Sequence, residues 1–240
     1  MSDGALISLL LPTRGRPEGV RRLLESIART ASRPRSIEVV IRADADDAAS
    51  HAFEQAPLAV RVLVGRPDKM GRMVRQCYQA SAGRIIGQFN DDLLCRTAGW
   101  DEAIARALAA YRDGVALAWC DDGFRGGRIC NFPFLTRQCC EMLGGPCPPE
   151  YNRDYIDTHL FDIFGKLSEL GHRRLAYLPN VLIEHLHVEA GKAEADATAL
   201  KPRPQADELT YLAWEDQRAA MARRLARRIC AAAREGSCAC

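Results

Sequence analysis

The sequence has no long hydrophobic run, almost no net charge and very little lysine. No stretch approaches the ~18 consecutive apolar residues of a membrane-spanning helix. The 33 basic and 31 acidic side chains leave a formal charge of +2, so the whole-chain charge gives no reason to expect a nucleic acid partner. Only four basic residues are lysines, at positions 69, 166, 192 and 201. These features leave a globular protein of mixed charge.

The ten cysteines lack the spacing of a metal site or of a disulfide framework. No C-x-x-C motif occurs, Cys139 and Cys140 are adjacent, and the terminal pair Cys238 and Cys240 is isolated. The first residues lack the basic segment and the long apolar core of a secretory signal. Because thiols stay reduced without export, we expect free cysteines in a cytoplasmic protein.

The first half of the chain alternates between strand and helix patterns. At 240 residues, 48% hydrophobic, it is long enough for one large domain or two small ones. The predicted strands are residues 6–11, 37–41, 60–64 and 85–89, and the predicted helices are residues 17–30, 48–55 and 71–81. This alternation is typical of a mainly parallel α/β sheet with helices on both faces.

The second half is less regular. We expect helices at residues 100–111, 155–170 and 207–234 and strands at residues 115–120, 129–135 and 181–188. Alternation in the last strand places Val181, Ile183, His185 and His187 on one face. The last helix is rich in arginine, at positions 218, 223, 224, 227, 228 and 234. A solvated helix face is the expectation there, and contact with an anionic membrane surface or with nucleic acid is the alternative.

Polar residues follow every predicted strand of the first half. In parallel α/β sheets, ligands bind beyond the carboxyl ends of the strands, so four polar ends in succession predict one ligand site. They are Thr13, Arg14, Gly15 and Arg16 after the first strand, Asp44, Asp46 and Asp47 after the second, Arg66 and Lys69 after the third, and Asn90, Asp91 and Asp92 after the fourth.

The adjacent carboxylates Asp91 and Asp92 follow an apolar run directly. Burying two like charges is costly unless something compensates them. A divalent cation would do so, and so would simple exposure to water in a turn. The residue types alone leave both interpretations open.

Several segments, in this order, resemble the GT-A-fold glycosyltransferases, most closely the inverting family 2 and its phage and bacterial relatives. They are ISLLLPTRGRP, the acidic cluster after the second strand, NDD followed by TAGWD, NFPFLTRQCCEMLGG, YIDTHLFDIFGKL and VLIEHLHVEAGKAEAD. The resemblance covers roughly residues 5–198. It implies a single GT-A, Rossmann-like domain at residues 1–200, with a nucleotide-binding half at 5–95 and an acceptor and catalytic half at 96–200. Residues 201–240 would form a C-terminal helical extension with a cysteine-containing tail.

The resemblance also implies roles for individual residues. Asp92 and one of two histidines, His185 or the alternative His187, would hold Mn²⁺ or Mg²⁺. Asn90 departs from the usual Asp-x-Asp pattern, which leaves Asp92 as the best direct ligand. The residues expected to contact the nucleotide sugar are Pro12, Thr13, Arg14, Asp44, Arg66, Lys69 and Asp91.

An inverting transfer needs a general base for the acceptor hydroxyl. Asp157 is the predicted base, and Asp154 is the alternative. Asp157 lies at the start of the predicted helix 155–170, where the helix dipole favours a charged carboxylate. The implied donor is a nucleotide-diphosphate sugar, with a UDP-sugar favoured. The acceptor stays open among a glycan, a lipid-linked sugar, a protein and a modified nucleic acid, and peripheral membrane association is an alternative to a purely cytoplasmic location.

Two other functions remain as alternatives. A nucleotidyltransferase on a similar sheet usually carries a glycine-rich phosphate loop after the first strand, and TRGRP contains a single glycine. A non-catalytic nucleotide-sugar-binding module would keep the acidic strand ends but would need neither Asp157 nor the histidines. The presence of all three groups favours an enzyme.

Overall fold

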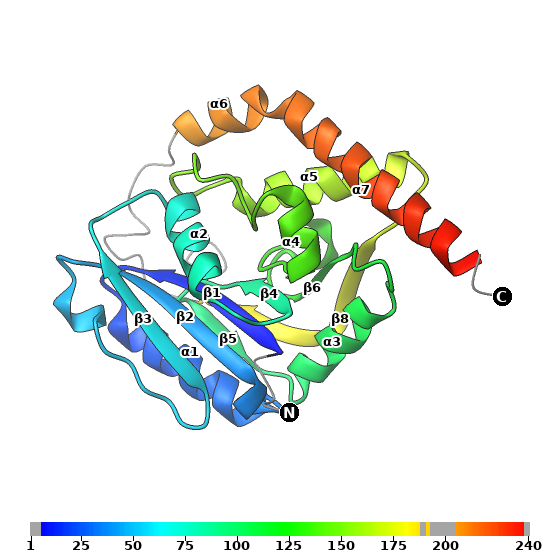
Figure 1. Cartoon of the computed structure of the whole chain (residues 1–240). Coiled ribbons are helices and arrows are strands. Elements are labelled where there is room, and N and C mark those ends of the chain that lie inside the picture. The colour runs from blue at the N-terminus through cyan, green and yellow to red at the C-terminus, as the bar shows by residue number, and fades with distance from the viewer. Residues whose placement is uncertain (1–5, 188–190, 193–204, 238–240) are drawn as a thin grey trace.

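An eight-stranded sheet of order β3-β2-β1-β4-β7-β6-β8-β5 runs through the molecule (Figure 1). The computed structural model describes residues 6–187, 191–192 and 205–237. The first half contributes strands β1 (Ile7–Thr13), β2 (Ile37–Asp44), β3 (Ala59–Gly65) and β4 (Ile85–Gln88), with helices α1 (Pro17–Thr30) and α2 (Met70–Ala80) between them. These strands pair in parallel, β1 with β2 and β4, and β2 with β3. The predicted parallel arrangement of these four strands is therefore confirmed.

The second half adds the mixed part of the sheet. Its strands are β5 (Leu93–Cys95), β6 (Leu117–Asp121), β7 (Phe134–Thr136) and β8 (Leu175–His185). Its helices are α3 (Trp100–Ala109), α4 (Arg137–Leu143), α5 (Ile156–Glu169), α6 (Gln205–Ala213) and α7 (Glu215–Ser237). Strand β7 runs antiparallel to β4 and β6, β6 and β8 are parallel, and β5 is antiparallel to β8. The last pairing sets Leu93 opposite His185, which brings the segment after β4 to the end of β8.

Several predicted elements differ from the structure. The helix expected at residues 48–55 is only a 3₁₀ turn, Ala48–Ser50. Asp47, the natural capping residue, does not cap this turn, and its carboxylate instead accepts a hydrogen bond from the Gly15 backbone N–H at 2.6 Å. The strand expected at 129–135 is confined to β7, because Phe132 has φ of +54° and leaves extended geometry. The helix expected at 207–234 is divided at Trp214 into α6 and α7.

The bounds of the last strand, and the segment after β4, also differ from the prediction. Strand β8 begins at Leu175, earlier than predicted, and ends at His185. His187 therefore lies just beyond the strand, and Val188 lies outside the described residues. The short strand β5 was not predicted, since Leu93–Cys95 is too brief for an alternation pattern.

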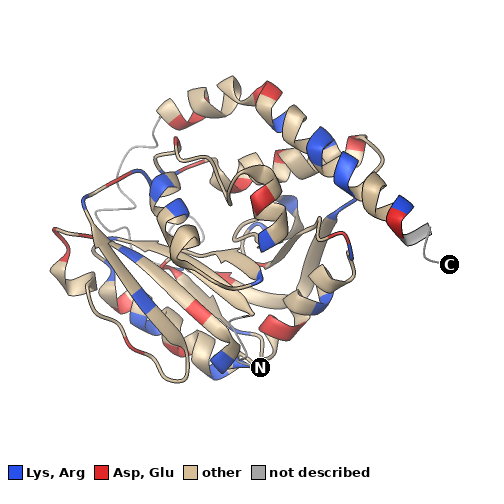
Figure 2. Ribbon diagram, in the orientation of Figure 1, with Lys and Arg blue, Asp and Glu red and all other residues tan. Residues whose placement is uncertain are grey.

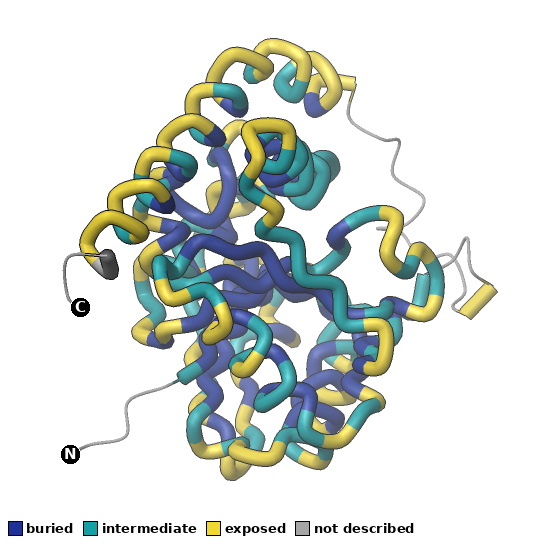
Figure 3. The backbone as a smooth tube through the Cα atoms, turned by 90° about the vertical axis from the view of Figure 1, so that its right-hand side faces the viewer, coloured by how far each residue is buried: buried dark blue, intermediate teal, exposed yellow. Residues whose placement is uncertain are grey.

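Helices cover both faces of the sheet and produce two cores. Alternate residues of β1 face opposite ways, so Leu9 packs with α1 and α3 while Leu10 packs with α2, α4, α5 and α7. The central strands are buried along their length and the outer turns of the helices are exposed (Figure 3). All eight cysteines in the described part of the chain are free thiols, and seven are buried, as expected for structural residues.

Helix α7 lies over α5 with an arginine-rich outer face (Figure 2). Arg223, Arg224 and Arg227 are exposed there. Arg218 does not belong to this solvated face, because it is fully buried. Its Nη2 donates to Glu215 at 2.7 Å, and its guanidinium lies 3.8 Å from the Tyr211 ring centroid. In the ranges that the structure describes, no helix combines the length and apolar character needed to cross a bilayer.

His159 should make the fold sensitive to acid. Its Nδ1 lies 2.9 Å from the Tyr151 hydroxyl between α5 and α7, and burial and the Arg218 charge lower its pKa to about 3. The unfolded chain has a histidine pKa of ~6.5, so between these values the unfolded state binds the extra proton. The contribution is complete above pH ~6.5 and is lost as the pH falls toward about 3.

Urea unfolding should therefore give a free energy about 2–3 kcal/mol lower near pH 4.5 than near pH 7 on account of this group. His159→Gln should remove most of that pH dependence, whatever its effect at pH 7. His172→Gln serves as the control for losing an imidazole elsewhere. An unchanged pH dependence in His159→Gln would contradict the assignment.

Candidate active site

The ends of β1 and β4 lie side by side and bring Thr13 to Asp91. Asp91 is only 6% exposed, and its Oδ2 accepts a hydrogen bond from Thr13 Oγ1 at 2.7 Å. Its Oδ1 accepts from Arg16 Nη1 at 3.0 Å. Helix α1 approaches closely, because a Cβ built on Gly19 would lie 2.5 Å from the Asp91 carbonyl oxygen. The carboxylate is thus held between β1 and the start of α1.

Asp92 links the same group to the end of β8. Its Oδ2 lies 3.4 Å from Arg16 Nη1 and its Oδ1 lies 3.4 Å from His185 Nε2. The Leu186 backbone N–H donates to the Asp92 carbonyl oxygen at 2.8 Å, which fixes the two segments to each other. Residues about 90 positions apart in the sequence therefore meet at one edge of the sheet.

The two adjacent carboxylates differ in their acidity. Burial raises the pKa of Asp91 above its ordinary value, although Thr13 and Arg16 oppose that rise. Burial acts on Asp92 in the same direction, but the nearby His185 imidazole and the Arg16 charge outweigh it and lower the pKa. Asp92 is therefore the carboxylate more readily available as an anionic ligand.

Asp92 and His185 provide a partial set of cation ligands. In the part of the chain that the structure describes, no group of three or more His, Cys, Asp or Glu side chains is arranged to hold a metal. The buried Asp92 Oδ1 and His185 Nδ1 nevertheless have no hydrogen-bond partner among the described residues. A carboxylate and an imidazole fit Mn²⁺ or Mg²⁺ when a bound phosphate supplies further oxygen ligands.

The two predicted histidines occupy different surroundings. His185 is 9% exposed, and its ring meets the Phe132 ring edge-on at 4.9 Å between centroids. The His187 ring lies 4.8 Å from that of His185 and stacks on Phe124 at 5.5 Å. His185 is also the histidine that lies 3.4 Å from Asp92 through its Nε2.

A second polar group lies at the ends of β1 and β2. Arg14 Nη1 lies 2.5 Å from Asp44 Oδ2, and the guanidinium also makes two hydrogen bonds to Asp46, at 2.7 and 2.8 Å. Asp44 is buried, and its Oδ1 lies 3.5 Å from Arg42 Nη1 without a hydrogen-bond partner in the described chain. Pro12 is buried in β1 beside Arg42 in the sheet register. This group offers a buried carboxylate oxygen to a ligand N–H.

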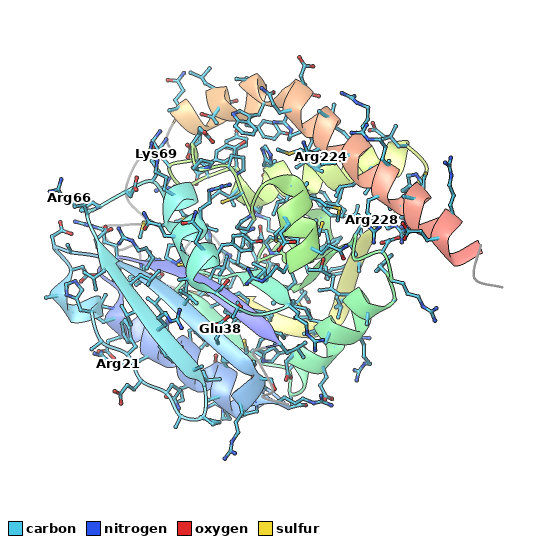
Figure 4. The ribbon with its side chains drawn as sticks, viewed as in Figure 1. Arg21, Glu38, Arg66, Lys69, Arg224 and Arg228 are labelled. Atoms are coloured by element: carbon cyan, nitrogen blue, oxygen red, sulfur yellow. The ribbon has the colours of Figure 1, made fainter. Side chains whose placement is uncertain are left out.

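Arg66 and Lys69 lie at the outer edge of the molecule (Figure 4). Both are exposed, and Lys69 Nζ donates to the Glu150 carbonyl oxygen at 3.3 Å. Arg66 directly follows Gly65, which pairs with Asp44 in the sheet. Arg66 lines an open cavity of about 390 Å³ beyond β3, together with Arg42, Asp68 and Gln76. Arg42, which contacts Asp44, connects this cavity to the second polar group.

Asp157 lies in the first turn of α5 and is partly buried. Its Oδ1 accepts a hydrogen bond from the Thr158 backbone N–H at 2.7 Å. Burial raises the pKa of Asp157 above its ordinary value, the opposite direction to the effect expected from the helix terminus. The raised pKa makes it a stronger base. The alternative, Asp154, is paired with Arg153 at 3.2 Å.

The contacts join Asp157 to His185 through residues 130–132. Cys130 Sγ donates to the Asp157 carbonyl oxygen at 3.3 Å, and two residues later the Phe132 ring meets His185. Between them, Asn131 Nδ2 donates to Asp122 Oδ2 at 2.7 Å. These contacts place the backbone at the start of α5 next to the segment before β7, and they involve the Asp157 carbonyl and not its carboxylate.

Two residues of this region were given no individual role from the sequence. Arg16, named there only as part of the polar stretch after the first strand, bridges both carboxylates. Asp122 follows strand β6 in the same way that Asp91 follows β4. It is 2% exposed, its Oδ1 accepts from the backbone N–H groups of residues 124, 125 and 126, and its carbonyl accepts from the His185 N–H. A carboxylate after a buried strand could have identified it.

No family model and no curated protein sequence matches the chain. Solved structures do match it. PcManGT, a mannosyltransferase from Pyrobaculum calidifontis in complex with GDP-Man and Mn²⁺, has a TM-score of 0.52 at 17% identity, covering 95% of this chain and 74% of that one. TarS from S. aureus has a TM-score of 0.53 at 11% identity over 75% of this chain. The TarS fragment 1–349 in complex with UDP has a TM-score of 0.52 at 12% identity.

The chain spans 36% of the TarS chain and 60% of its fragment 1–349. At these identities, the likeness concerns the fold. The chain has the predicted GT-A fold, a mixed α/β sheet flanked by helices that is shared with glycosyltransferases.

Proposed function

We propose that the protein is a metal-dependent glycosyltransferase of the family 2 type. It transfers a sugar from a nucleotide-diphosphate sugar to an acceptor hydroxyl with inversion. The observation that carries the proposal is the meeting of Asp92 with His185 beside the buried Asp91. This group lies beyond the carboxyl ends of β1 and β4, where ligands bind in α/β sheets.

The donor nucleotide lies across the ends of β1 and β2 in this proposal. The buried Asp44 Oδ1 accepts a hydrogen bond from a base N–H, which suits the uracil of a UDP-sugar and equally the guanine of a GDP-sugar. Pro12, Thr13 and Arg14 border the base and ribose, and Asp91 contacts the ribose. Arg66 and Lys69, with Arg42 nearby, attract the diphosphate from the outer edge. PcManGT with GDP-Man and TarS with UDP support a nucleotide ligand for this fold.

Asp92 and His185 would hold Mn²⁺ or Mg²⁺ together with phosphate oxygens, and a cation held there would supply neutralisation of the charge on the leaving diphosphate. Asp157 accepts the proton of the acceptor hydroxyl as its oxygen attacks the anomeric carbon. The new carbon–oxygen bond forms as the bond to the diphosphate breaks, and the nucleoside diphosphate leaves with the electron pair. This single displacement inverts the anomeric configuration.

The nucleotidyltransferase alternative is less well supported. Its triphosphate would need free backbone N–H groups in the loop after β1. In this loop the Gly15 N–H donates to Asp47, and Arg14 is paired with Asp44 and Asp46. These groups of the loop are therefore already bonded to acidic side chains of the protein.

A thermal-shift screen tests the proposal. Purified protein is heated with UDP-glucose, UDP-GlcNAc, GDP-mannose and ATP, each with and without Mn²⁺. A sugar nucleotide with Mn²⁺ should raise the melting temperature more than either component alone, because binding stabilises the folded state by mass action. Stabilisation by ATP alone would favour the nucleotidyltransferase, and no response to any sugar nucleotide would contradict the proposal.

A further inference from the structure

Asp207 of α6 holds a loop that precedes the predicted base. Its carboxylate is fully buried, with 0% exposure. Oδ1 accepts hydrogen bonds from the Asn152 backbone N–H at 2.7 Å and from Asn152 Nδ2 at 2.8 Å. Oδ2 accepts from the backbone N–H groups of Arg153 and Asp154, both at 2.9 Å. These four bonds lower the pKa of Asp207 against the opposing effect of burial, so the carboxylate remains ionised.

This loop also carries contacts to the donor side of the sheet. The backbone N–H groups of Met70 and Gly71, at the start of α2, donate to the carbonyl oxygens of Asn152 and Tyr151, each at 3.0 Å. Gly71 packs tightly here, since a Cβ on it would lie 2.3 Å from the Pro148 carbonyl oxygen. The loop is thus fixed to the helix that follows β3.

The same loop leads directly into α5 and Asp157. Tyr155, the residue before α5, has φ of +68°, a left-handed conformation that is unfavourable for a tyrosine unless its surroundings enforce it. Its ring lies 5.1 Å from the ring of Tyr211 on α6. Helix α6 therefore contacts the entry to α5 twice, through Asp207 and through Tyr211.

We propose that Asp207 is a positioning residue of the transferase, which sets the loop at residues 151–155 and thereby the orientation of Asp157. This inference rests on the proposed function for the part that concerns catalysis. It makes the helices at residues 205–237 part of the catalytic unit. The donor contacts proposed for β1, β2 and β4 do not involve Asp207, whereas Lys69, proposed to attract the diphosphate, bonds through Nζ to the Glu150 carbonyl oxygen beside this loop. Loss of Asp207 should therefore lower turnover much more than donor affinity.

Asp207→Asn is the principal test, and Glu208→Gln, an exposed neighbour on the same helix, is the matched control. An asparagine keeps one acceptor oxygen but turns an NH₂ group toward the backbone N–H groups. Hydrogen exchange followed by mass spectrometry should then show faster exchange in residues 151–155 and unchanged exchange in β1 and β4. Glu208→Gln should exchange like the parent. This comparison does not depend on glycosyl transfer.

Turnover is followed as nucleoside diphosphate release from UDP-glucose or GDP-mannose, with water as the acceptor, and donor Kd by calorimetry with Mn²⁺. Asp207→Asn should lower kcat by about 10- to 100-fold, because small misplacements of catalytic groups have effects of this size, and should leave Kd within about twofold. The pH at which kcat of Asp207→Asn falls on the acidic side should also move toward the ordinary range of an aspartate, because Asp157 becomes more exposed.

Unchanged exchange in residues 151–155 would overturn the positioning role, and so would parental kcat. An equal loss of donor affinity and turnover would also overturn it, since that pattern belongs to general destabilisation. If Asp207→Asn does not fold, Asn152→Ala decides the question, because it removes only the Nδ2 bond. It should give a smaller fall in kcat at unchanged Kd, and parental kcat would reject the proposal. If the parent binds no sugar nucleotide, the proposed function fails. The hydrogen-exchange comparison then still tests whether Asp207 holds the loop at residues 151–155.

Discussion

Asp157→Asn should lower kcat by about 10²–10⁴-fold and leave donor affinity nearly unchanged, since general-base catalysis contributes that factor. The substitution is nearly isosteric and keeps an oxygen that can accept the Thr158 N–H. It removes only the ability to take up the proton of the acceptor. Steady-state kinetics should therefore show a loss in kcat with donor KM little changed.

The pH profile provides a second readout of the same group. The ionised form of Asp157 is the active base, so kcat falls as the pH drops through its pKa. Burial moves that pKa upward from ~3.9, so the acid limb should lie at higher pH than for an exposed aspartate. Asp157→Asn should lose this limb.

Asp154→Asn is the matched control and should cost much less, because Asp154 pairs with Arg153. Near-parental turnover in Asp157→Asn would move the base elsewhere. An NMR analysis of the product should show inverted anomeric configuration. A retained configuration would reject the single displacement whichever residue is the base.

Asp92→Ala should abolish the metal-dependent part of donor binding. The change removes the carboxylate that faces both His185 and Arg16. Loss of groups around a metal ligand commonly costs 10–100-fold in metal affinity, and loss of the ligand itself should cost at least about 100-fold. Calorimetric titration of UDP and of GDP, with and without Mn²⁺, measures the effect.

Asn90→Ala provides the comparison within the same three residues and should be milder, because Asn90 contributes no anionic ligand. Metal alone should bind weakly to the parent, since the described residues offer only a pair of neighbouring ligands. Equal Mn²⁺-dependent affinity in Asp92→Ala and the parent would remove Asp92 from the metal site.

The parallel half of the fold could be predicted because its local signals agree. Strand β1 is buried along its whole length and is apolar apart from Ser8 and Thr13, and α1 begins at a proline and carries an apolar stripe. Residues 48–55 have a helical composition, but their capping residue Asp47 bonds to Gly15. A contact across 32 positions decides this segment, and local propensity carries no information about it.

The candidate site likewise has a part that local sequence predicts and a part that depends on contacts between distant segments. Acidic strand ends were visible in the sequence, and the parallel sheet necessarily gathers them at one edge. The pairing of β5 with β8, which brings Asp92 to His185, joins distant segments through only three residue pairs. The raised pKa of Asp157 depends on burial by surrounding segments, so the position in the helix alone gave the opposite direction. Asp207 lies in a helix beyond the resemblance and showed no signal in the sequence.

The most direct test of the account is an anomalous diffraction map of crystals grown with Mn²⁺ and UDP or GDP. The account predicts one strong manganese peak within bonding distance of the carboxylate of Asp92 and a ring nitrogen of His185, with the diphosphate bound to the same ion and the base beside Asp44. A map in which the nucleotide binds elsewhere, or in which manganese is absent from Asp92 while the nucleotide is present, would contradict it.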